Sequence, residues 1–184
     1  MRSNPPLLLV FGVSGVGKTT ACQDLARRRP EIAYVRASQI LGQHLNLDSD
    51  GLRKVSTDQM VTNQIILSEA LKQFRREHPE QIIVVDAHAV IDNDSSLSQV
   101  PAAVIASIEP EGLILLEAEP EAVERRRRLD NRPRPIRTVE EISREIAAER
   151  LAVLDYGRLL KVPIFVANVK SGFTLDEYVD AILH

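Results

Sequence analysis

A glycine-rich stretch near the beginning of the chain contains the residue types best suited to binding phosphate. Gly12-Val-Ser-Gly-Val-Gly-Lys18-Thr-Thr20 fits the pattern G-x-x-x-x-G-K-[ST], in which backbone N–H groups surround the α- and β-phosphates of a nucleotide. Lys18 would bring a compact positive charge to the β- and γ-phosphates, and Thr19 a hydroxyl ligand for Mg²⁺. The stretch could instead be a plain turn with a solvated lysine, but the order of its four constrained positions favours a phosphate site.

The segments on either side are those that such a loop requires. Apolar residues 7–11 predict a buried strand before the loop, and residues 20–28 predict a helix after it. Glycines within the loop can take positive φ and let the backbone approach an anion closely. The helix that follows would add its N-terminal dipole to phosphate binding.

Further strand-like runs predict a sheet built around this first strand. Helix-like segments separate the runs, which is typical of a parallel sheet covered on both faces. We therefore expect an α/β fold with three layers, α/β/α. The five predicted strands are residues 7–11, 33–35, 82–85, 113–116 and 164–166.

Helix starts are indicated by capping boxes at Ser56, Thr138 and Thr174, where a hydroxyl precedes an acid or amide by three residues. The first two boxes open long helices, over about residues 56–77 and 138–161. The polar residues 91–100 predict a loop.

Composition limits the classes of protein to consider. The 184 residues suit one domain, residues 1–184, and a formal net charge of −3 does not call for nucleic acid or a membrane as partner. The lone Cys22 cannot form an internal disulfide, which favours a reducing compartment. No run approaches the roughly 18 apolar residues of a membrane span. These features predict a cytoplasmic protein, and they leave its oligomeric state open.

Two polar residues follow the predicted strand at residues 82–85. Asp86 lies where ligands collect outside the carboxyl ends of parallel strands, and an acid there holds Mg²⁺ through water in phosphate-loop enzymes. We expect Asp86 to be that metal carboxylate, with a turn or cap role as the alternative. His88 could contact a substrate phosphate or hydrogen-bond within its own loop.

The densest charge in the chain is a run of seven arginines within residues 125–137. Four consecutive helical positions point in four directions, so residues 125–128 cannot all face one partner. Pro133 and Pro135 favour an extended flap that carries Arg132 and Arg134. An arginine on a transferring phosphoryl group contributes far more than an exposed ion pair, which favours a catalytic flap. A nucleic-acid patch is the alternative, disfavoured because no aromatic residues lie nearby.

Taken together, these motifs resemble those of archaeal-type adenylate kinases over nearly the whole chain. The resemblance rests on the phosphate loop, on Asp86-Ala-His-Ala89, on Leu115-Leu-Glu-Ala-Glu-Pro120 and on Arg132-Pro-Arg134. It implies a P-loop NTPase fold with a small arginine-rich lid at residues 128–138 and an acceptor-binding insertion at residues 36–80. It also implies ATP-dependent phosphoryl transfer, with Mg²⁺, to a nucleoside monophosphate such as AMP.

The resemblance also implies a role for individual residues. Lys18 and Asp86, with Arg128, Arg132 and Arg134, would act in catalysis, and Thr19 and Asp86 would bind the metal. Arg53 and His88 would bind the acceptor. The residues implied in ATP binding are Gly12, Ser14, Gly15, Val16, Gly17, Lys18, Thr19, Thr20, Asn168 and Lys170.

One segment departs from the adenylate kinase pattern and keeps other functions open. Where the family has an arginine and a glycine/proline-rich loop, this chain has Asp92-Asn-Asp-Ser-Ser96, whose carboxylates would repel a monophosphate unless they were neutralised. A kinase of a small metabolite alcohol, with Asp50 or Asp92 as the base, would explain these acids. An ATP-binding switch or assembly factor is a third hypothesis.

Overall fold

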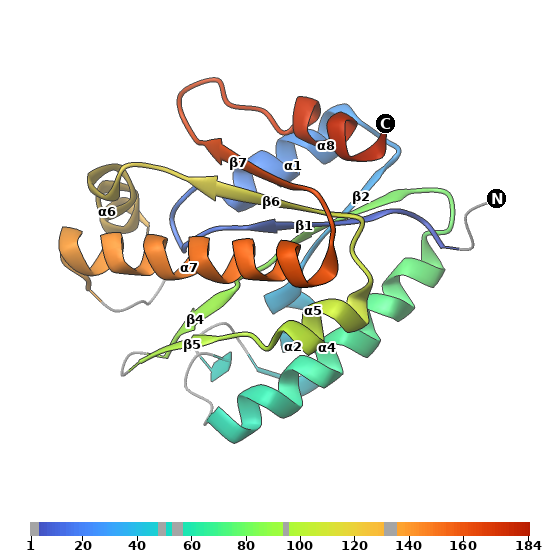
Figure 1. Cartoon of the computed structure of the whole chain (residues 1–184), viewed down its shortest axis with the longest axis horizontal. Helices are drawn as coiled ribbons and strands as arrows, with labels where there is room; N and C mark the ends of the chain where they lie inside the picture. Colours follow the sequence, from blue (N-terminus) through green and yellow to red (C-terminus); the bar gives the residue numbers. More distant parts are fainter. Residues whose placement is uncertain (1–3, 48–50, 53–56, 94–95, 131–135) are drawn as a thin grey trace.

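Five parallel strands form the centre of the computed structural model, which describes residues 4–47, 51–52, 57–93, 96–130 and 136–184. The strand order is β2-β3-β1-β6-β7, so the strand before the phosphate loop lies in the middle of the sheet (Figure 1). All five strands predicted from the apolar runs are confirmed. They are β1 (Leu7–Phe11), β2 (Ile32–Arg36), β3 (Ile82–Asp86), β6 (Gly112–Glu117) and β7 (Ile164–Asn168).

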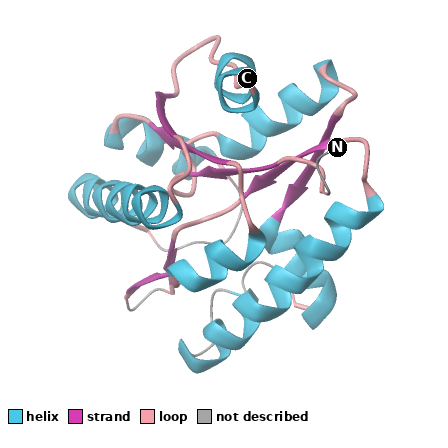
Figure 2. Cartoon of the chain, turned by 45° about the vertical axis from the view of Figure 1, so that its right-hand side comes forward, coloured by secondary structure: helices cyan, strands magenta, loops and turns pink. Residues whose placement is uncertain are grey.

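Helices cover both faces of the sheet, as the three-layer prediction requires (Figure 2). On one face lie α1 (Lys18–Arg28) and α8 (Asp176–Leu183), and α6 (Pro120–Leu129) packs near the phosphate loop. The other face carries α2 (Ala37–Leu45), α4 (Thr57–Glu77), α5 (Ala102–Ile108) and α7 (Val139–Leu160).

The apolar runs were good strand predictors because the central strands are buried on both faces. In β1 every residue is buried, and alternate side chains enter opposite cores. Leu7, Leu9 and Phe11 pack under α4, α5 and α7, whereas Leu8 and Val10 pack with α1. Burial on both sides removes the polar alternation of a half-exposed strand.

None of the helices in the described part of the chain combines the length and the apolar character that a membrane span requires.

Two predictions of local structure are wrong. The stretch predicted as a loop contains two short strands that pair in antiparallel fashion, β4 (Val90–Asp92) and β5 (Leu97–Gln99). Tertiary contacts hold it, because the hydroxyl of Tyr156 donates to the carbonyl of Val100, beside β5. At α8 the N-cap is Leu175 and no side chain caps the helix, so the box at Thr174 does not form.

The other capping boxes fared differently. Thr138 accepts from the N–H of Glu141, and the Glu141 carboxylate accepts from the N–H of Thr138, so this box is confirmed at the start of α7. Its reciprocal bonds satisfy two N–H groups that the first helical turn leaves without partners. The box at Ser56 lies outside the described residues.

Candidate active site

The loop between β1 and α1 turns its backbone inward, around a space at the carboxyl edge of the sheet. Gly12, Gly15 and Gly17 all have positive φ, at 144°, 83° and 115°. At Gly12 a Cβ would lie 2.5 Å from the carbonyl oxygen of Leu116 on β6, so only glycine fits there. Val16 is fully buried and anchors the loop in the core. The loop therefore has the geometry that backbone binding of phosphate needs.

Lys18, the first residue of α1, lies folded over this loop. Its ammonium donates to the carbonyl oxygens of Gly12 and Val13 and lies 3.8 Å from Oδ1 of Asp86. The side chain is only 5% exposed. Burial lowers the pKa of Lys18, and the negative charge of Asp86 opposes that shift.

Thr19 and Asp86 bring two hard oxygen atoms together at the start of α1 and the end of β3. The Thr19 hydroxyl donates to Oδ2 of Asp86 over 2.7 Å. These atoms fit Mg²⁺ that arrives with a nucleotide, because Mg²⁺ keeps several waters and needs only one or two protein oxygens beside the phosphates. Among the described residues, no group of three or more His, Cys, Asp or Glu side chains could hold a metal by itself.

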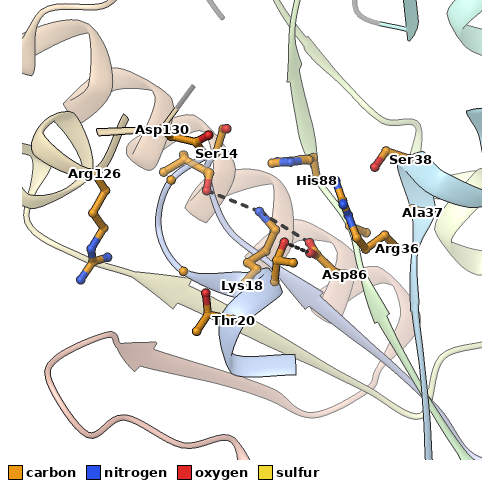
Figure 3. A pocket seen from close by; sticks show the side chains of 15 residues that line it. Ser14, Lys18, Thr20, Arg36, Ala37, Ser38, Asp86, His88, Arg126 and Asp130 are labelled. Atoms are coloured by element: carbon orange, nitrogen blue, oxygen red, sulfur yellow. Dashed lines mark hydrogen bonds and ion pairs between the residues drawn. The ribbon is translucent and has the colours of Figure 1, made fainter. Parts of the chain in front are cut away.

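A pocket of about 290 Å³ extends from the loop toward the ends of β2 and β3 (Figure 3). Ser14, Lys18 and Thr20 line one side, and Arg36, Ser38 and His88 face them. Sequence reasoning missed Arg36 and Ser38. Arg36 could have been found, because it ends the second strand at the same sheet edge as Asp86, its register partner.

His88 is open to the pocket, yet its ring lies among positive charges. Desolvation, with the nearby charges of Lys18 and Arg127, lowers the pKa of His88 well below its usual value. The imidazole is therefore neutral near pH 7 and can donate one hydrogen bond and accept another.

The arginines of α6 divide into two kinds according to the face they lie on. Arg126 donates to the carbonyl of Val16 over 2.7 Å and Arg127 to the carbonyl of Ser14 over 2.8 Å, so both hold the phosphate loop. Arg127 also forms a two-bond ion pair with Glu145 of α7. In contrast, Arg128 is 79% exposed and pairs with Glu124 on its own helix, so the structure does not bring it to the pocket.

Asp92, which departs from the adenylate kinase pattern, is neutralised by another of the seven arginines. Arg137 donates to both of its carboxylate oxygens, over 3.0 and 2.9 Å. Asp92 does not line the pocket. The sequence analysis expected Asp92 to repel a monophosphate unless it were neutralised, and Arg137 meets that condition.

The other predicted site residues stay predictions. Asn168 and Lys170 are exposed at and after the end of β7 and do not line the pocket. The neighbouring Val169 lies close to Gly17, so their segment borders the phosphate loop. Arg53, Arg132 and Arg134 lie outside the described residues, as do Asp50 and residues 131–135 of the segment predicted as a lid.

Sequence reasoning missed Glu149, a buried carboxylate of α7. It is 1% exposed and accepts hydrogen bonds from the backbone N–H groups of Gly12, Ala89 and Val90. The sequence feature that could have revealed it is an acidic residue on the apolar face of an amphipathic helix, three residues before the buried Ala152.

Comparisons with known proteins agree with this geometry. The model of the family described as "AAA domain" matches residues 11–143. Similar relatives named adenylate kinase are those of Methanococcus aeolicus, 27% identical over 96% of this chain and 95% of the relative, and of Methanocaldococcus jannaschii, 26% identical over 96% of each. The Pyrococcus furiosus adenylate kinase is 26% identical over 97% of this chain and 94% of its own.

A search of solved structures finds the same architecture at much lower identity. Shikimate kinase from Bacteroides thetaiotaomicron matches with a TM-score of 0.57 and 14% identity, over 96% of both chains. At that identity the likeness shows the α/β/α fold alone.

Proposed function

Because the chain belongs to the family described as "AAA domain", whose model covers residues 11–143, we propose that it is an adenylate-kinase-like P-loop phosphotransferase. It moves the γ-phosphate of Mg·ATP to a nucleoside monophosphate, AMP. One observation carries the proposal: a single pocket contains groups suited to a triphosphate and, opposite them, groups suited to a second phosphate. The names of the relatives support AMP as the acceptor.

The donor half of the proposal rests on the phosphate loop. The loop amides surround the β-phosphate, and Lys18 exchanges the carbonyl of Gly12 for oxygens of the β- and γ-phosphates. Thr19 and Asp86 would hold the Mg²⁺ that accompanies ATP. When bound, that ion would supply positive charge to the phosphates.

The acceptor half rests on Arg36 and His88. Arg36 supplies a fixed positive charge at the end of β2, and neutral His88 supplies a hydrogen bond without repelling Lys18. Residues 36–80, the predicted acceptor-binding segment, begin at this arginine. Because Asp92 is paired with Arg137, its two oxygens are occupied, which speaks against Asp92 as the base of an alcohol kinase.

The reaction needs positioning and charge stabilisation more than covalent chemistry. Phosphoryl transfer passes through a loose transition state with charge spread over the transferred group, so fixed cations and amides lower the barrier. Lys18 and the loop amides provide these on the donor side, and Arg36 fixes the acceptor phosphate in line. No residue of the chain forms a covalent intermediate.

The proposed reaction is tested by measuring ADP formation from Mg·ATP with each of AMP, CMP, GMP, UMP and dTMP. Stimulation by AMP well above the blank without acceptor supports the proposal. Turnover that no monophosphate stimulates would exclude it and leave a metabolite kinase or an ATP-hydrolysing switch. A cytoplasmic location is part of the proposal, since it suits an enzyme of adenine nucleotides and the buried thiol of Cys22.

A further inference from the structure

One carboxylate on α7 is bonded to both halves of the candidate site. Oε1 of Glu149 accepts from the N–H of Gly12 over 3.0 Å and from the N–H of Ala89 over 2.9 Å, and Oε2 accepts from the N–H of Val90 over 2.8 Å. The side chain is 1% exposed. Burying a carboxylate is costly, and three N–H donors are what makes such a buried charge tolerable.

The three donors belong to two segments with different tasks. Gly12 opens the phosphate loop, whereas Ala89 and Val90 directly follow His88 and lead into β4. The two segments therefore meet on a single oxygen atom, Oε1. Any movement of Gly12 that lengthens its bond alters the same oxygen that holds Ala89.

Neighbouring residues of α7 fix this arrangement from either side. One turn earlier, Glu145 holds Arg127, which donates to the carbonyl of Ser14 in the phosphate loop. Two turns later, the hydroxyl of Tyr156 shares its one proton between the carbonyls of Val100 and Ala89, the latter at 3.2 Å. Because a helix packed into a protein core bends little along its length, α7 acts as a stiff support for both segments.

We propose that Glu149 is a positioning residue that couples the phosphate loop to the loop carrying His88, so that nucleotide binding on one side orders the acceptor side. The inference rests on the proposed function only for the names donor and acceptor, because the coupling itself can be measured with nucleotide alone. A carboxylate is required for this task. A glutamine would keep one acceptor oxygen and turn an NH₂ donor toward a backbone N–H.

The experiment is amide hydrogen exchange, followed by mass spectrometry, with and without a non-hydrolysable Mg·ATP analogue. The measured quantity is the ratio of exchange rates without and with the nucleotide, for peptides covering the phosphate loop and for peptides covering Ala89 and Val90. In the native chain we expect both ratios to exceed one. In Glu149→Gln the loop ratio persists, while the ratio at residues 89–90 falls from roughly ten in the native chain to about one, the size of effect expected for loss of a charged hydrogen bond.

Two further variants separate coupling from a purely structural role. Asp155→Asn removes a negative charge from the same helix at an ion pair with Arg158 and should leave both ratios unchanged. Glu149→Asp keeps the charge with a shorter reach and should give an intermediate ratio at residues 89–90. If Glu149→Gln does not fold, as judged by circular dichroism, Glu149→Asp decides: a reduced ratio supports the coupling and a native ratio overturns it.

The outcomes also distinguish this inference from the proposed function. A folded Glu149→Gln with the native ratio at residues 89–90, or a native chain with no nucleotide effect there, overturns the coupling and leaves the kinase proposal standing. A native chain that couples normally but turns over no monophosphate supports the coupling and rejects AMP as acceptor. If the nucleotide slows hydrogen exchange at no amide of the phosphate loop, both the coupling and the kinase proposal are rejected.

Discussion

Replacing Arg127 by alanine should destabilise the protein strongly, whereas the same change at the adjacent Arg128 should do almost nothing. Arg127 and Glu145 are each 9% exposed and joined by two hydrogen bonds, and Arg127 also donates to the carbonyl of Ser14. Arg128 is 79% exposed and pairs with Glu124, one turn away on the same helix. The two substitutions remove the same side chain from a buried and from an exposed position of one helix.

The expected sizes follow from burial. Removing one partner of a buried ion pair costs about 3–5 kcal/mol, because the other charge stays buried without compensation. For a chain of this size that lowers Tm by about 6–20 °C. An exposed pair one turn apart on a helix contributes about 0.3–0.5 kcal/mol, or about 1–2 °C. Replacing both partners by apolar residues, Arg127→Met with Glu145→Leu, should recover most of the loss.

Thermal unfolding followed by circular dichroism, at one protein concentration and without nucleotide, measures all four proteins. The double variant is the control for loss of packing around the pair. Equal Tm values for Arg127→Ala and Arg128→Ala would refute the conclusion that Arg127 is a buried structural residue and Arg128 an exposed one. So would an Arg127→Ala protein with native Tm and greatly reduced kcat, because that result would make Arg127 a phosphate ligand.

Three further changes test other parts of the site. Gly12→Ala should abolish binding of Mg·ATP in equilibrium dialysis, because the new Cβ would meet the carbonyl oxygen of Leu116. The control Gly172→Ala, at a positive φ but with nothing within 4 Å, should bind normally and lower the free energy of unfolding by only about 1 kcal/mol. Normal binding by Gly12→Ala would contradict the loop geometry. The lowered pKa of His88 means that, as pH falls, the unfolded chain takes up a proton at this imidazole more readily than the folded chain does. Tm should therefore fall more steeply with pH in the unmutated protein than in His88→Asn. Parallel Tm curves from about pH 7.5 to about 5 would contradict the lowered pKa. Asp92→Asn should lower the free energy of unfolding in urea by about 1–3 kcal/mol, because its ion pair with Arg137 is lost, and should leave kcat within a few-fold of the native value. A loss of kcat beyond about 100-fold would instead make Asp92 a catalytic base.

The parts of the molecule that could be predicted from sequence are those that neighbouring residues determine. The phosphate loop is contiguous, and its glycines, Lys18 and Thr19 carry both its conformation and its chemistry. The five strands were recognisable because burial on both faces leaves unbroken apolar runs. Asp86 was found because parallel strands deliver their last residues to a common edge.

The parts that could not be predicted depend on contacts between distant residues. The β4–β5 hairpin has a polar sequence typical of a loop, and it is held by Glu149 and Tyr156, which lie about two turns apart on a helix far along the chain. Four consecutive arginines carry no mark of which ones face inward. The buried Val123 gives the only hint, since Arg126 and Arg127 follow it by three and four residues and share its face.

The most direct test of the central claim is to follow the label of [γ-³²P]ATP when native protein, Mg²⁺ and AMP are mixed. The account predicts that the label moves into ADP, and that Lys18→Met reduces this transfer to the blank while the fold is kept. Label that appears only in inorganic phosphate, or transfer that Lys18→Met leaves unchanged, would contradict it.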